Sequence, residues 1–383
     1  MTQNGTTVCL HPGGTLGYPQ GGGHRWVFLN WALGLRALGC RVIWLETVNG
    51  KANSERLSRR IAILKEQLAA YGLGDSLALC YEAGKPLPPE LADGCLQFDD
   101  AAGAADLLLN QRYGAGRALV QRFRRSALLD IDPGLLQVQV SRGWYTVAPH
   151  DLYFTIGETV GQPGARFPDL ALQWQYTPPA VALDWWSPAS PAPDAAFTTV
   201  AHWWTGGGIY DTPDEVSQDN KRAAFAPYLD LPQRLAQPFE LALDIPPSAA
   251  EEQVKLERQG WRVRHSHKVA ATPWDYQRYV QGSLGEFSCA KPSTVRLETA
   301  WISDRTICYL ASGKPAVVQH TGPSRFLPDG AGLFRFRDPD EAARSVEVVV
   351  TDYERQCELA RALAEEFFDA KKVARSVLER ALA

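Results

Sequence analysis

Apolar and polar residues follow two alternating periods along the chain. Short apolar runs at 8–11 and 41–46 predict buried β-strands, and the amphipathic stretch between them, at 24–38, predicts a helix that ends before Gly39. A strand, a glycine-rich loop, a helix and a second strand within about forty residues form a βαβ unit. Such a crossover implies a parallel sheet that is covered on both faces.

The same alternation continues and then restarts after a proline-rich segment. In the first half we expect further strands at 77–81, 94–98, 127–131 and 151–157, and helices at 54–71 and 112–125. Prolines cluster at 187–195 and predict a semi-rigid linker. In the second half we expect strands at 197–201, 239–243, 261–263 and 315–318, and helices at 273–282, 305–312, 339–350 and 352–382. The pattern therefore predicts two α/β domains of similar size, at 1–186 and 196–366.

Composition narrows the class of protein. The 383 residues are 45% hydrophobic and 21% charged, which is typical of a soluble globular chain with a large core. The net charge is −4 and the first 186 residues balance 16 basic against 16 acidic side chains, so neither half is a basic, nucleic-acid-binding domain. Seven scattered cysteines without a Cys-x-x-Cys pair favour a reducing cytoplasm over a disulfide framework or a zinc site. No signal peptide or membrane span is expected.

The glycine-rich loop at 13–23 leads into a helix that begins near His24. A helix N-terminus attracts anions, but the loop has neither the Gly-x-Gly-x-x-Gly spacing of a dinucleotide site nor the lysine of a P-loop. NAD binding is therefore disfavoured, and a flexible substrate-binding loop fits better. His24 is expected to be neutral, because the helix dipole disfavours its charged form. The side chain serves either as a general base or as a helix cap.

Three polar features follow strands of the first half. Asp130 and Asp132, before Pro133 and Gly134, admit three interpretations: a metal site, a general base or its orienting carboxylate at Asp132, or simply a turn. Glu158 either contacts a sugar hydroxyl or caps the next segment. A group of arginines suggests either a nucleic-acid patch or a solvated helix face, and the second is favoured. These arginines are Arg117, Arg122, Arg124 and Arg125.

The most distinctive stretch lies at 285–322. It predicts a loop, a helix, a glycine stop, a buried strand and a second polar loop. The helix N-terminus at Ser303, Asp304 and Arg305 faces the edge of the sheet where a diphosphate would bind. Arg305 and Lys291 would supply positive charge to a departing nucleoside diphosphate.

The sequence Ala-Ser-Gly-Lys-Pro at 311–315, followed by an apolar strand, resembles the donor-domain signature of GT-B glycosyltransferases. The longer string Gly-Glu-Phe-Ser-x-Ala-Lys … Trp-x-Ser-Asp-Arg … Cys-Tyr-Leu-Ala-Ser-Gly resembles a bacterial group described only as glycosyltransferase-like. The resemblance extends to 130–134, 150–151 and 157–158. It implies two Rossmann-like domains facing a cleft, with the acceptor in the first, a nucleotide sugar in the second, and a final helix at 367–383 that crosses back. Such enzymes need no bound metal.

The resemblance also implies roles for individual residues. The donor diphosphate and nucleotide would meet Gly206, Gly207, Ser288, Lys291, Ser303, Asp304 and Arg305. The nucleobase would meet Val269, Ala270 and Trp274. The sugar would meet Glu158, Gln319, His320 and Thr321, and the acceptor loop would include Gly22 and Gly23. Retaining members carry two glutamates where this chain has Ala300 and Cys308, so the stereochemistry is not implied.

Together these features predict a cytoplasmic, metal-independent glycosyltransferase. It would move a sugar from a nucleoside diphosphate donor, in the first place a UDP-sugar, to a hydroxyl-bearing acceptor, with His24 or Asp132 as the base. No further cofactor is expected. The alternatives are a nucleotide-sugar epimerase or hydrolase, a DNA-base glucosyltransferase, and a non-catalytic nucleotide-sugar-binding module. The balanced charge favours a small acceptor over nucleic acid.

Overall fold

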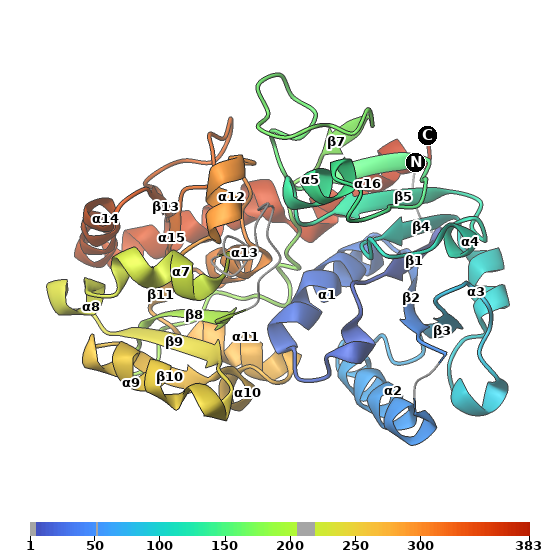
Figure 1. Cartoon of the computed structure of the whole chain (residues 1–383), viewed down its shortest axis with the longest axis horizontal. Helices are drawn as coiled ribbons and strands as arrows, with labels where there is room; N and C mark the ends of the chain where they lie inside the picture. Colours follow the sequence, from blue (N-terminus) through green and yellow to red (C-terminus); the bar gives the residue numbers. More distant parts are fainter. Residues whose placement is uncertain (1–4, 51–52, 205–218) are drawn as a thin grey trace.

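The computed structural model describes residues 5–50, 53–204 and 219–383, which form two parallel β-sheets with helices on their faces (Figure 1). The predicted Gly206 and Gly207 lie outside the described residues. The first sheet has the strand order β3-β2-β1-β4-β5-β6-β7. Its strands are β1 (Thr7–His11), β2 (Arg41–Val48), β3 (Leu77–Tyr81), β4 (Leu107–Asn110), β5 (Ser126–Asp130), β6 (Leu152–Thr155) and β7 (Trp174–Tyr176). The helices of this half are α1 (Gly22–Ala37), α2 (Ser54–Ala69), α3 (Phe98–Ala104), α4 (Arg117–Val120) and α5 (Leu135–Ser141).

The second sheet has the order β10-β9-β8-β11-β12-β13. Its strands are β8 (Phe197–His202), β9 (Phe239–Asp244), β10 (Arg262–His265), β11 (Gly285–Ser288), β12 (Ala316–Gln319) and β13 (Leu333–Phe336). The helices are α7 (Lys221–Phe225), α8 (Leu231–Arg234), α9 (Ala250–Arg258), α10 (Ser266–Val269), α11 (Pro273–Gly282), α12 (Pro292–Leu297), α13 (Asp304–Ala311), α14 (Pro339–Thr351), α15 (Tyr353–Leu363) and α16 (Ala370–Ala381). In each sheet the order reverses beside the first strand, so a crevice opens at the carboxyl edge.

The chain ends by returning to the first sheet. After α15 a π-helical turn at Ala364–Phe368 redirects the backbone, and α16 packs on α1. A side chain at Gly34 on α1 has no room, because its Cβ would lie 2.6 Å from the carbonyl oxygen of Ala370. The predicted fold, two Rossmann-like units with a helix that crosses back, is confirmed.

Three local predictions are wrong. The stretch 94–98 is not a strand: Leu96 makes only an isolated bridge with Ala78, and α3 begins at Phe98. The helix expected at 112–125 shrinks to Arg117–Val120, and the strand before it is Leu107–Asn110. The loop expected at 285–288 is β11, a central strand of the second sheet. Glu286 makes that strand hard to recognise in the sequence, because an acidic residue is not expected in a buried strand. Here the Glu286 side chain is 0% exposed.

The arginine group also differs from its predicted placement on one helix, since Arg122, Arg124 and Arg125 lie beyond α4. Arg122 pairs with Asp99 at 2.7 Å and Arg124 with Asp106 at 3.0 Å, while Arg125 donates to the carbonyl oxygen of Ala381 at 3.0 Å. These partners suit a solvated surface rather than a phosphate-binding patch. Among the described residues, no helix is long and apolar enough to span a membrane.

Candidate functional site

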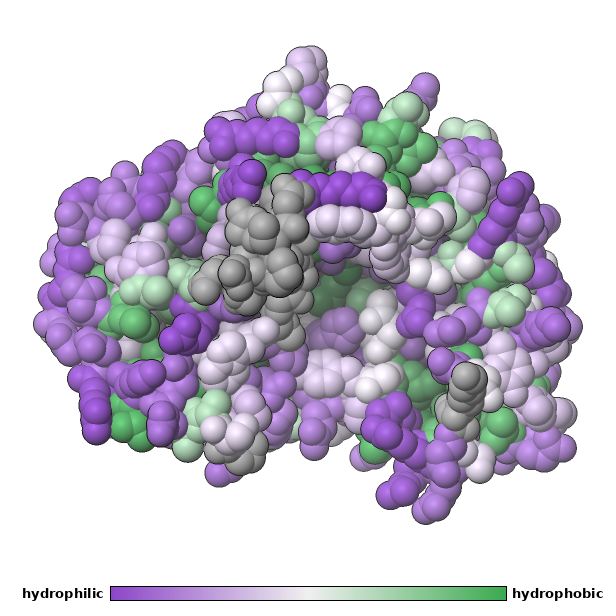
Figure 2. Space-filling view, viewed as in Figure 1, coloured by the Kyte–Doolittle hydropathy of each residue, from purple (hydrophilic) through white to green (hydrophobic). Residues whose placement is uncertain are grey.

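The carboxyl edges of the two sheets face a cleft of about 400 Å³. The first half contributes the loop at 18–24 and the start of α1, and the second contributes the ends of β8 and β9 and the N-terminus of α13. The surface is hollowed between the two halves (Figure 2). From the sequence we predicted a cleft between the two halves, with the candidate residues around it.

His24 lines this cleft on the first turn of α1. Its Nε2 lies 3.2 Å from the carbonyl oxygen of Gly13, so that nitrogen carries the hydrogen and Nδ1 is the basic one. Burial, the neighbouring Arg25 charge and His202 across the cleft together lower the pKa of His24 to about 4, although the bond to Gly13 opposes them. The imidazole is therefore neutral at physiological pH, which suits a proton acceptor.

Asp130 ends β5 and Asp132 lies two residues beyond it, and the two carboxylates differ in environment. Asp130 is fully buried, and its oxygens accept from Tyr113 Oη at 3.0 Å, Gln137 Nε2 at 2.9 Å and Thr155 Oγ1 at 2.9 Å. These bonds make Asp130 the organiser of the turn. Within the described parts of the chain, no group of three or more His, Cys, Asp and Glu side chains is arranged to hold a metal.

Asp132, in the first half, interacts electrostatically with Lys291 of the second half. Desolvation by the surrounding protein raises the pKa of Asp132, and the Lys291 ammonium opposes that rise. Burial, with the Asp132 carboxylate second, raises the pKa of Asp304 to about 7. A carboxylate from each half and a lysine are thus electrostatic neighbours, an arrangement that suits proton transfer.

The second half gathers three cations: Lys221, Lys291 and Arg305. Arg305 donates its Nε–H to Glu286 at 2.7 Å and an Nη1–H to the carbonyl oxygen of Val200 at 3.1 Å. Lys221 donates to the carbonyl oxygen of Cys289. Burial, followed by the Arg305 charge, lowers the pKa of Lys221 to about 7. An anion bound beside Lys221 would restore its charge.

Several predicted donor residues meet Lys221 around a small cavity of about 20 Å³ behind α13. They are Ser288, Ser303, Arg305, Gln319 and Thr321. The structure thus brings together residues that are far apart in the sequence. Lys221 was not predicted. The residue before Lys221 is Asn220, whose side chain caps α7 by accepting from Ala223 N at 2.9 Å. This helix cap is a sequence signal for the start of α7, but it does not indicate a role for Lys221.

The residues expected at the nucleobase divide. Ala270 lines the cleft, whereas Val269 and Trp274 are not among its lining residues. The carbonyl oxygen of Ala270 accepts from Gly22 N at 3.1 Å, so this segment is also where the two halves touch. A Cβ at Gly22 would lie 2.1 Å from the Thr272 carbonyl oxygen, and a Cβ at Gly23 would lie 2.8 Å from the Tyr276 ring. The close approach of the two halves explains both glycines.

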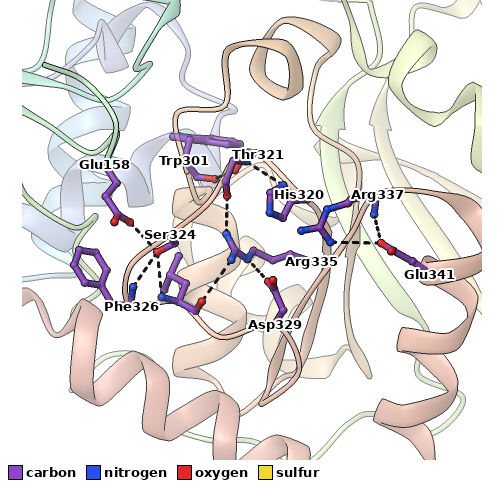
Figure 3. Close-up of polar contacts among 12 residues, drawn as sticks. Glu158, Trp301, His320, Thr321, Ser324, Phe326, Asp329, Arg335, Arg337 and Glu341 are labelled. Atoms are coloured by element: carbon purple, nitrogen blue, oxygen red, sulfur yellow. Dashed lines mark hydrogen bonds and ion pairs between the residues drawn. The ribbon is translucent and has the colours of Figure 1, made fainter. Parts of the chain in front are cut away.

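Three of the residues expected at the sugar, Glu158, His320 and Thr321, are shown in Figure 3. Gln319 accepts from Ala290 N at 3.1 Å, Thr321 donates to the Trp301 carbonyl oxygen, and His320 accepts from Gly322 N at 3.2 Å through Nδ1. Burial lowers the pKa of His320. Glu158, in contrast, is bound to the segment that follows them, at Ser324 and Arg325.

Sequence reasoning missed a second titratable cluster, on the donor side of the cleft. Asp244 accepts from His202 Nδ1 at 3.0 Å and lies 3.4 Å from His267 Nε2. The Tyr18 ring, from the opposite half, lies between His202 and His24, at centroid distances of 5.5 Å and 6.0 Å. These residues come from separate elements, so no local sequence motif signals the cluster.

No family model matches the chain, and no curated protein matches it. Solved structures do. Sucrose-phosphate synthase from Thermosynechococcus elongatus has a TM-score of 0.56 at 12% identity, over 98% of both chains. HepE from Anabaena, in complex with UDP-glucose, has a TM-score of 0.56 at 13% identity, over 98% of both chains. An alpha-glucosyltransferase in complex with UDP and a 13-mer DNA has a TM-score of 0.56 at 11% identity, over 98% of this chain and 99% of that one.

The chain has the GT-B fold. At this level of identity the similarity to solved structures establishes the fold alone. The chemistry has to be inferred from the residues of the site. In a GT-B protein the cleft between the two sheets is the place to look for it. His24, Asp304 and Arg305 line that cleft, and Lys221 lines the small cavity beside Arg305. Lys291 is an electrostatic neighbour of both Lys221 and Asp132.

Proposed function

We propose that this protein is a glycosyltransferase that moves a sugar from a nucleoside diphosphate donor, in the first place a UDP-sugar, to a hydroxyl-bearing acceptor. The observation that carries the proposal is the convergence of Lys221, Lys291 and Arg305 near the N-terminus of α13, at the carboxyl edge of the second sheet. HepE and the alpha-glucosyltransferase, which share the fold, were both solved with UDP. In the proposed reaction these side chains, rather than a metal ion, offset the charge of the departing diphosphate.

Lys221 provides a distinctive feature of the proposed donor site. With a pKa of about 7, it is only partly protonated at neutral pH. A diphosphate beside it would favour the ammonium form, so donor binding takes up a proton. Lys291, at the start of α12, and the backbone N–H groups at Ser303 and Asp304 complete the proposed diphosphate site.

The acceptor hydroxyl must lose a proton as the glycosidic bond forms, and two groups are placed to take it. Asp132 faces the donor half beside Lys291, and His24 presents a neutral imidazole in the cleft. We propose Asp132 or His24 as the base, as the sequence suggested. Gln319, His320 and Thr321 remain the proposed sugar contacts, and Ala270, with Val269 and Trp274 near it, the proposed nucleobase region. Asp304 is the proposed ribose contact. Glu158 is left out of the sugar contacts, because its carboxylate is already occupied.

Titration calorimetry with UDP-, GDP-, ADP- and dTDP-sugars and the free nucleotides tests the proposal. We expect saturable binding of at least one uridine nucleotide, with proton uptake that appears as a buffer-dependent enthalpy. The absence of binding across the whole panel would contradict the proposal. Incubation with donor alone, followed by sugar analysis, separates a transferase, which leaves the donor intact, from an epimerase or hydrolase, which does not.

The alpha-glucosyltransferase with bound DNA raises a second candidate, a transferase that acts on DNA. A gel shift on duplex DNA at increasing salt tests it, because phosphate contacts dominate such binding and weaken with salt. We expect no salt-sensitive shift, since Arg122 and Arg124 are paired with carboxylates. A clear salt-dependent complex would favour the DNA-modifying candidate over a small acceptor.

A further inference from the structure

Glu158, in the loop after β6 of the first half, is bound entirely by the second half. Its Oε2 accepts from Ser324 Oγ at 2.7 Å, and its Oε1 accepts from the backbone N–H and the Nε–H of Arg325, each at 2.8 Å. The carboxylate group is nearly enclosed, with 4% of the side chain exposed. Figure 3 shows Glu158 reaching Ser324 from the opposite half. Charge-assisted bonds of this kind are among the stronger polar contacts in proteins.

The same loop holds a second segment of the donor half. Arg166 pairs with Glu298 at 2.7 Å, and Thr159 Oγ1 donates to the Glu298 carbonyl oxygen at 3.2 Å. We call this set of contacts, between 158–166 on one side and 296–298 and 324–325 on the other, the interdomain clasp. Residues 299–302 connect the segment 296–298 to Ser303 and α13, and residues 322–323 connect the proposed sugar contacts at 319–321 to 324–325.

The chain on both sides of Ser324 and Arg325 is held by further contacts. Arg335 on β13 donates to the carbonyl oxygens of Gly322 at 3.0 Å and Leu327 at 3.4 Å, and Figure 3 shows its pairing with Asp329. Phe326 stacks on Tyr176 of β7 with ring centroids 5.4 Å apart. Gly322 adopts φ +123°, and a Cβ there would lie 2.6 Å from the Glu298 carbonyl oxygen. We therefore expect a displacement at Ser324 to reach Thr321, three residues earlier in the chain.

We propose that Glu158 is a positioning residue for the donor sugar: by holding Ser324 and Arg325 it sets the position of Gln319, His320 and Thr321. The inference rests on the proposed function, since it assigns a task to the proposed sugar contacts. The diphosphate cations are held separately, Arg305 by Glu286 and Lys221 by the Cys289 carbonyl oxygen. The bonds of Glu158 therefore act on the segment of the proposed sugar contacts, whereas the cations of the proposed diphosphate site have partners of their own. Because the clasp joins the two halves, tight binding of the sugar would also require the two halves to be in contact.

Binding of UDP and of UDP-glucose, measured side by side by calorimetry, tests the proposal. In Glu158→Ala we expect UDP-glucose to bind about tenfold more weakly, while UDP binds within about twofold of wild type. Ser324→Ala removes one of the three bonds and is expected to give a smaller loss of the same kind. Glu158→Gln keeps an oxygen that can accept from the Arg325 N–H, so it should restore part of the affinity for UDP-glucose.

Asp99→Ala is the matched control, because it removes the carboxylate of a carboxylate–arginine pair inside the first half, with Arg122. It should leave both affinities unchanged. Thermal unfolding of each variant checks that it is folded. If Glu158→Ala does not fold, the comparison of UDP with UDP-glucose is made on Ser324→Ala instead. Equal losses for UDP and UDP-glucose, or no loss for either, would overturn the positioning role while the proposed function stands. If wild type binds neither ligand, the proposed function fails and the positioning role fails with it.

Discussion

Arg305 donates its Nε–H to the carboxylate of Glu286 at 2.7 Å, and this pair joins the N-terminus of α13 to the centre of the second sheet. The Glu286 side chain is 0% exposed and that of Arg305 is 13% exposed. A buried charge is costly unless it is paired, so each side chain needs the other. The pair explains how a charged residue stands in a central strand, and it fixes the guanidinium at the edge of the cleft.

Glu286→Ala should therefore destabilise the protein strongly. Removing one partner leaves the Arg305 charge uncompensated, and the expected loss is about 3–5 kcal/mol in the free energy of unfolding. Urea denaturation measures it. Glu286→Gln, which keeps an acceptor for the Arg305 N–H, should lose less. A loss below about 1 kcal/mol in Glu286→Ala would show that solvent or another group compensates Arg305.

Gly22→Ala should weaken the contact between the two halves. The added methyl would sit 2.1 Å from the Thr272 carbonyl oxygen, which is backbone and cannot rotate away. We expect a lower melting temperature and weaker UDP-sugar binding. Gly103→Ala on α3 is the control, because no atom lies within 4 Å of the place its methyl group would take, and alanine is the better helix former by about 1 kcal/mol. Equal stability of Gly22→Ala and Gly103→Ala would contradict the close approach.

His24 should contribute to the loss of stability in mild acid. Its folded pKa is about 4, below the ordinary value of about 6.5, so between these limits the unfolded chain binds a proton that the folded chain does not. Stability therefore falls as the pH drops from about 6.5 towards about 4, and is unaffected by His24 above that window. In His24→Asn the decline between pH 7 and pH 5 should be shallower. Unfolding curves at both pH values measure it; an unchanged decline would place His24 in solvent.

Asp304 should act in the opposite direction. Its folded pKa of about 7 exceeds the ordinary value of about 4, so the folded chain holds the proton more tightly. Its contribution to stability is full below about pH 4 and is lost as the pH rises to about 7. Asp304→Asn cannot titrate, so its stability relative to wild type should rise across that window and then level off. Asp132→Asn should narrow the window, because the Asp132 charge helps to raise the pKa of Asp304. A constant difference at all pH values would contradict a raised pKa.

The elements that a sequence reveals best are those whose pattern is set by local burial. The unit β1, α1 and β2 followed from its apolar periods and from Gly39, and α13 and β12 from the apolar runs around Gly313. The strand at Gly285–Ser288 was missed because its polarity makes sense only with Arg305 beside it. The short strand at Leu107–Asn110 was missed in favour of the segments that flank it.

The candidate site divides in the same way. Ser303 and Arg305 were predicted from their place at the start of a helix, and Ser288 and Gln319 were implied by the family resemblance; all four line one small cavity. Lys221 could not be found so, since its lowered pKa comes from burial and from Arg305, which only the folded chain supplies. The partners of Glu158 lie in the other half of the chain. No pattern near residue 158 indicates them. A sugar contact was expected at Glu158, and the structure shows its carboxylate bound to Ser324 of the other half.

The most direct test of the account is the titration of wild type and of Lys221→Gln with UDP at pH 7, in two buffers of different ionisation enthalpy. We predict that wild type binds one UDP with uptake of a fraction of a proton, and that Lys221→Gln binds at least about tenfold more weakly without that uptake. Binding of UDP that is equally tight in both proteins would remove Lys221 from the site. No binding of UDP or of any UDP-sugar to wild type would contradict the central claim, that the cleft holds a nucleoside diphosphate.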